Sequence, residues 1–77
     1  YGFGTSIDLA KAYELYLESA NGGYGKGMDL VGRFYNRGIY VERDRKRAEY
    51  WLQKAMNSSD PDAVDDAKRE IGFNGII

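Results

Sequence analysis

Apolar residues recur along this chain at spacings of three and four, the pattern of helices that bury one face. The clearest stripe comprises Ala48, Trp51, Leu52, Ala55 and Met56. All the stripes together predict four helices: residues 8–20, residues 25–36, a third between Asp44 and Asn57, and a fourth from Asp60 that ends at Gly72. The chain is therefore expected to be all-α.

The predicted helix ends carry suitable residues. Asp8, Asp44 and Asp60 precede the first, third and fourth helices, where a carboxylate can accept hydrogen bonds from unpaired backbone N–H groups. Within the second helix, Gly27 and Gly32 each lower helix stability by about 1 kcal/mol relative to alanine. We expect a neighbouring helix to approach closely at both glycines, because close packing would justify that cost.

An internal repeat relates the four helices. A shift of 36 residues superposes the first helix on the third and the second on the fourth. The shift aligns identical residues at six pairs of positions: Gly2 and Gly38, Asp8 and Asp44, Ala12 and Ala48, Asn21 and Asn57, Asp29 and Asp65, and Arg33 and Arg69. A two-helix unit of this length cannot bury its apolar stripe alone, so neighbouring units should stack into a solenoid.

At these positions the chain resembles the Sel-one-like repeat (SLR) family, a relative of the tetratricopeptide repeat. The residues that carry the resemblance are Gly27, Val31, Gly32, Tyr35, Gly38, Val41, Asp44, Arg47, Ala48, Trp51, Ala55 and Met56. Tyr40 stands where the family's loop has its second glycine. The resemblance implies an α–α superhelix of about two repeats, with helices in the order B, A, B, A. It also implies an adaptor or scaffold and not an enzyme.

Composition narrows the possible functions. The 77 residues are 43% hydrophobic and 30% charged, with a net charge of -1, which is typical of one folded domain. We expect residues 1–77 to be a single repeat domain cut from a longer solenoid. Neither Cys nor His is present, so we expect no cofactor, no metal and no catalysis. We also expect no membrane contact, and we slightly favour a reducing compartment such as the cytoplasm.

The resemblance implies that the second and fourth helices line a concave groove that binds another protein. Residues assigned to this groove are Lys26, Asp29, Arg33, Asn36 and Arg37, then Asp62, Asp65, Arg69 and Phe73, with Tyr40 in the loop as a further contact. We expect a charged cleft that reads an extended peptide, with Arg33 and Arg69 as carboxylate clamps. Alternatively, Asp29 with Arg33 and Asp65 with Arg69 are ordinary i,i+4 pairs on a solvated face.

Charge is unevenly distributed along the chain. Residues 33–47 hold six basic and two acidic side chains, a net +4, whereas residues 60–70 hold two basic and five acidic ones, a net -3. The basic side chains at Arg43, Arg45, Lys46 and Arg47 could bind an acidic partner segment. Nucleic acid is disfavoured because the total charge is small. A separate alternative is self-association through the chain ends, at Tyr1, Phe3, Ile76 and Ile77.

Overall fold

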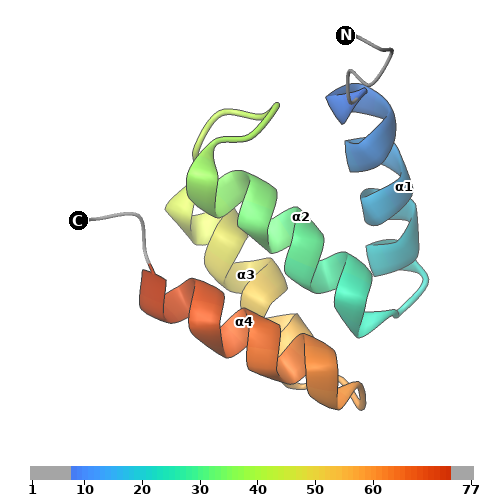
Figure 1. Ribbon diagram of the computed structural model, residues 1–77, viewed down its shortest axis with the longest axis vertical. Helices are drawn as coiled ribbons and strands as arrows, with labels where there is room; N and C mark the ends of the chain where they lie inside the picture. The colour runs from blue at the N-terminus through green and yellow to red at the C-terminus, as the bar shows by residue number, and fades with distance from the viewer. Residues whose placement is uncertain (1–7, 74–77) are drawn as a thin grey trace, which may run out of the picture.

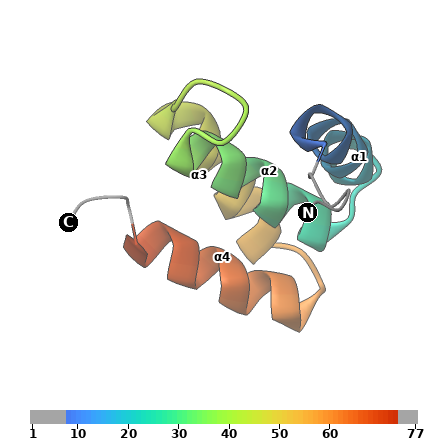
Figure 2. The same ribbon diagram turned by 45° about the horizontal axis from the view of Figure 1, so that its top comes forward.

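The computed structural model describes residues 8–73, and these form four α-helices, as the sequence predicts. The helices are α1 (Leu9–Asn21), α2 (Gly25–Arg37), α3 (Arg45–Met56) and α4 (Pro61–Phe73). Helix α2 lies at the centre and packs against the other three, and α4 also packs against α3 (Figure 1). Among the described helices, α1 contacts α2 alone and stands apart from α4 (Figure 2).

The predicted helix caps are confirmed. Asp8 Oδ1 accepts a hydrogen bond from the Lys11 backbone N–H at 3.0 Å, and Asp44 Oδ1 accepts one from Arg47 at 3.1 Å. Asp60 Oδ1 accepts from the backbone N–H groups of Asp62, at 3.0 Å, and Ala63, at 3.4 Å. These bonds satisfy donors that the helices leave free, so each aspartate defines where its helix starts.

Three predicted helix ends fall one residue short, because α1 continues to Asn21, α2 to Arg37 and α4 to Phe73. Helix α4 does not end at Gly72 but continues to Phe73. Gly72 is not among the residues with positive φ, so it stays in the helix instead of reversing the chain. By contrast, Gly38 ends α2 in the left-handed conformation at φ +67°, which glycine adopts without steric cost.

The core forms where α2 meets its neighbours. Its buried members are Ala20, Met28, Val31, Ala48, Leu52, Ala55 and Ala67, and Tyr13, Tyr16, Leu17, Tyr35, Trp51 and Met56 pack around them while half-buried. The predicted stripes therefore face inward, and Trp51 belongs to the core as expected. Two stripe residues are exceptions, because Leu9 at the start of α1 and Ile71 near the end of α4 are exposed.

Both interior glycines of α2 have a packing reason. A Cβ atom on Gly27 would lie 2.6 Å from the backbone nitrogen of Ala20 in α1. A Cβ atom on Gly32 would lie 2.7 Å from Leu52 Cγ in α3. These separations are shorter than van der Waals contact, so the two glycines allow α1 and α3 to approach α2 closely.

The α2–α3 loop keeps a glycine-like conformation at Tyr40. This residue has φ +65°, a left-handed value that costs a side-chain-bearing residue about 1–3 kcal/mol. Its exposed ring lies 5.6 Å from the ring of Tyr13, centroid to centroid. The position that holds a glycine in the resembled family is thus left-handed here despite its side chain, and the tyrosine ring contacts α1.

Candidate functional site

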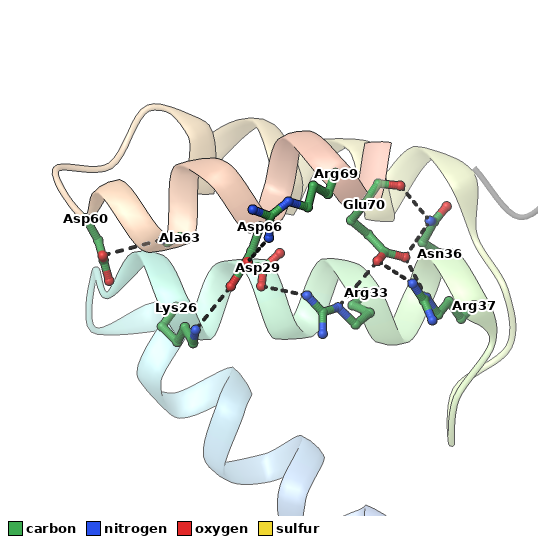
Figure 3. A network of polar contacts seen from close by, with 10 residues as sticks. All are labelled: Lys26, Asp29, Arg33, Asn36, Arg37, Asp60, Ala63, Asp66, Arg69 and Glu70. Carbon is green, nitrogen blue, oxygen red and sulfur yellow. Dashed lines mark hydrogen bonds and ion pairs between the residues drawn. The ribbon is translucent and has the colours of Figure 1, made fainter. Parts of the chain in front are cut away.

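Charged and polar side chains concentrate where α2 and α4 lie side by side, running in the same direction (Figure 3). We call this cluster the polar seam: Lys26, Asp29, Arg33, Asn36 and Arg37 from α2, with Asp66, Arg69 and Glu70 from α4. Most of the cations come from α2, whereas α4 supplies two of the three carboxylates. The two helices are therefore joined by opposite charges.

Glu70 is the best-bonded carboxylate of the polar seam. Its side chain is 2% exposed, and it accepts hydrogen bonds from Arg37 Nε at 2.8 Å and Arg37 Nη2 at 2.9 Å. Asn36 Nδ2 donates a third bond to Glu70 Oε2 at 2.8 Å, and Arg33 Nε lies 3.4 Å from Oε1. The two parallel hydrogen bonds from Arg37 to Glu70 fix how the side chains are oriented and strengthen the contact between α2 and α4.

Asp29 also contacts Arg33, but only one of its two carboxylate oxygens accepts a hydrogen bond. Its side chain is fully buried, and Oδ2 accepts a hydrogen bond from Arg33 Nη2 at 3.3 Å. Within the described residues, Oδ1 has no hydrogen-bond partner. A buried carboxylate oxygen without a donor is costly, because water no longer solvates it.

An outer layer of ion pairs continues the polar seam. Lys26 Nζ lies 3.1 Å from Asp66 Oδ2, and Arg69 Nη1 lies 3.4 Å from Asp66 Oδ1. The hydrogen bond with Lys26 lowers the pKa of Asp66 and raises that of Lys26. Both cations are exposed, so these pairs contribute little to stability.

The two buried carboxylates have opposite pKa shifts. Burial raises the pKa of Asp29 to about 6, and the Arg33 charge offsets this only in part. Burial would also raise the pKa of Glu70, but the hydrogen bonds from Arg37 and Asn36 lower it on balance. At neutral pH, Glu70 is therefore firmly ionised, whereas Asp29 is ionised at a cost and takes up a proton near pH 6.

The structure brings together only part of the predicted groove. Lys26, Arg33, Arg37 and Arg69 reach solvent along the polar seam, and Asp62, Asp65 and Tyr40 are exposed. Two assignments need correction: Asp29 and Asn36 do not face a groove but are buried, because α4 packs over them. The Phe73 side chain and residues 1–7 and 74–77, including the four proposed self-association residues, lie outside the described part.

The pairing within α4 also differs from the prediction. Arg69 pairs with Asp66, three residues away, whereas the sequence suggested Asp65 at four. The predicted Asp29–Arg33 pair is present, but its carboxylate is buried and not solvated.

Sequence reasoning missed Glu70. Its position after Ala63 and Ala67, at spacings of four and three, places a charge on the buried stripe of α4, and this signal could have revealed it.

The basic stretch, residues 43–47, is largely paired within the chain. Arg47 Nε lies 3.4 Å from Asp44 Oδ2, Arg45 Nη2 lies 4.0 Å from Glu49, and Arg43 Nε donates to the Asn36 carbonyl at 2.9 Å. Lys46 is exposed. Arg43 and Arg47 also border a shallow hollow of about 430 Å³ beside the α2–α3 loop. Only the Arg45–Glu49 pair among these contacts adds a carboxylate from outside residues 33–47, so this part of the surface stays basic.

Across residues 8–73, no group of three or more acidic side chains is placed to hold a metal ion. None of the helices in this part of the chain is long and apolar enough to span a membrane.

Stacked helix pairs with a 36-residue repeat define an α-helical repeat protein. The family model of the Sel1 repeat matches residues 1–24 and 25–60, and the chain belongs to this family. No curated protein and no solved structure matches the chain. Sel1 repeats generally mediate protein–protein interactions, and proteins built from them are typically scaffolds without enzymatic activity. Helix α4 lies beyond the second matched segment.

Proposed function

We propose that this protein is an adaptor that holds a segment of another protein along the exposed edge of the polar seam. We call this surface the seam rim, and it comprises the solvent-accessible seam residues Lys26, Arg33, Arg37 and Arg69 together with two exposed acids of α4, Asp62 and Asp65. The general role of Sel1 repeats supports a protein partner. One observation supports the choice of surface: the buried carboxylates of Asp29 and Glu70 hold the side chains of Arg33 and Arg37 in place.

Preorganisation favours this surface over other charged parts of the chain. Arg33 and Arg37 each contact Glu70, which is anchored in turn by Asn36. An arginine that is already held loses less conformational freedom when a partner binds, so more of the contact energy contributes to affinity. Lys46 lacks such support in the described contacts, because it lies exposed at the start of α3.

Affinity capture from a lysate of the source cells tests the proposal. The bait is the full 77-residue chain, compared with an Arg69→Glu variant and a Lys46→Glu control that makes the same charge change elsewhere. Arg69 is the right position because its side chain is mostly exposed, whereas reversing Arg33 would place a third acid beside Asp29 and Glu70. We expect Arg69→Glu to lose a protein that Lys46→Glu retains. Retention by Arg69→Glu, or loss by Lys46→Glu alone, would contradict the seam rim as the binding surface.

A further inference from the structure

At one end of the seam rim three arginine side chains are accessible to solvent, whereas the carboxylates that hold two of them are buried. The side chains of Arg33, Arg37 and Arg69 are 33%, 41% and 77% exposed. The carboxylates that two of them contact are almost inaccessible, with Asp29 at 0% and Glu70 at 2%. A partner that approaches this end therefore meets guanidinium groups before it meets any acid of the buried pair.

Asp29 is the group that can change the charge of this end. The charged groups that face it are Arg33 and Lys26 from α2 and Asp66 and Glu70 from α4. Arg33 is shared between Asp29 and Glu70, at 3.3 Å and 3.4 Å. A proton on Asp29 would neutralise one of the two anions that bind Arg33, and the unpaired Oδ1 is a free position for that proton.

We infer that the seam rim binds its partner through the carboxylates of an acidic segment, and that protonation of Asp29 strengthens this binding. The inference rests on the proposed function, because it concerns the same surface. With Asp29 neutral, Arg33 keeps its charge and loses one internal partner, so its attraction for an external carboxylate increases. Glu70 stays ionised and continues to hold Arg37 in place.

The pH range follows from the side chains involved. Asp29, with a pKa of about 6, is mostly ionised at pH 7.5 and mostly protonated at pH 5.5. Aspartate in an unstructured peptide has a pKa of about 3.9, so an acidic segment keeps its charge over this range. Linkage also requires the reverse effect: binding of an acidic segment raises the pKa of Asp29.

Fluorescence anisotropy with a fluorescein-labelled hexa-aspartate peptide tests the inference on the full chain. We expect the peptide to bind about fivefold more tightly at pH 5.5 than at pH 7.5. An Asp29→Asn variant should bind at pH 7.5 as tightly as the unmodified chain does at pH 5.5, with no pH dependence. The matched control is Asp62→Asn, an exposed rim acid, which should retain the pH dependence.

Two comparisons locate the bound peptide. Arg69→Gln should weaken binding, whereas Lys46→Gln should leave it unchanged. Weakening by Lys46→Gln alone would assign the peptide to the basic stretch, and equal weakening by both variants would mean that the peptide is attracted by charge without a defined site. Either result would overturn the inference. Equal affinity at both pH values would overturn the role of Asp29.

Failure of the inference can be told apart from failure of the proposed function. If hexa-aspartate does not bind while Arg69→Glu still abolishes capture of a cellular protein, the rim is the binding surface but its partner is not acidic. If Asp29→Asn does not fold, ¹³C NMR of the Asp29 carboxyl group in the unmodified chain replaces it. A pKa that fails to rise when hexa-aspartate binds would then refute the linkage.

Discussion

At the residue scale, two glycines determine how closely the helices pack. Gly27 faces the backbone of α1, and Gly32 faces Leu52 of α3. Backbone atoms cannot rotate away as side-chain atoms can, so the contact at Gly27 is the less forgiving of the two. Gly72 has the opposite surroundings, because no atom of another helix lies within 4 Å of the place where a Cβ would be.

Replacing Gly27 by alanine should therefore destabilise the protein. A Cβ 2.6 Å from the Ala20 nitrogen would push α1 away from α2, at a cost of about 1–3 kcal/mol, and the better helix propensity of alanine would offset up to about 1 kcal/mol. Urea denaturation followed by circular dichroism measures the change. Gly72→Ala is the control and should be neutral or slightly stabilising, so equal destabilisation by both variants would contradict the close approach.

Asp29 gives the protein an unusual pH dependence of stability. Its pKa in the folded state, about 6, exceeds that of an unfolded aspartate, so the folded state binds the proton more tightly. The resulting stability is fully present below the unfolded pKa and is lost as pH rises through about 6. Glu70 has the opposite sign: its pKa is lowered, so the stability that it contributes is lost in more acidic solution.

The free energy of unfolding should accordingly rise by about 1 kcal/mol when pH falls from 7.5 to 5.5. Urea titrations at the two pH values measure this difference. In Asp29→Asn the rise should disappear, because the amide does not titrate. An unmodified chain that is less stable at pH 5.5 than at pH 7.5 would show that Asp29 is not a buried, destabilised anion.

At the scale of elements, the polar seam joins α4 to α2. Replacing Glu70 by glutamine removes the charge that Arg33 and Arg37 contact while keeping the size of the side chain. We expect the free energy of unfolding to fall by about 2 kcal/mol. Hydrogen bonds to charged groups contribute about 1.5–3 kcal/mol, and the arginines can partly regain water. Thermal unfolding measures it, with the exposed Asp65→Asn as a control that should change stability by less than about 0.5 kcal/mol. A loss no larger than that of the control would mean that the polar seam does not stabilise the docking of α4.

The helices themselves were predictable from sequence, because the spacing of apolar residues and the capping aspartates are local signals. The burial of the residues inside the polar seam was not predictable. Helical spacing shows that Asp29, Arg33 and Asn36 share a face, but it does not show whether that face meets water or another helix. The prediction put Asp29 and Asn36 in a solvated groove for this reason. Only the packing of α4 shows that they are buried.

At the scale of the whole molecule, α2 links the packing to the proposed surface. Its apolar face contacts α1 and α3, while its polar face carries most of the cations of the polar seam. A change that displaces α4 would therefore also alter the seam rim. The fold and the proposed binding surface are for this reason best tested with variants at exposed positions.

Site-specific photo-crosslinking tests the adaptor account most directly. A benzophenone side chain replaces either Asp65 on the seam rim or Tyr50 on the exposed face of α3, and each protein is irradiated in a lysate of the source cells. The account predicts a crosslinked protein from position 65, absent from position 50 and lost when Arg69→Glu is added. A crosslinked protein from position 50 alone would place the binding surface on α3 and contradict the account.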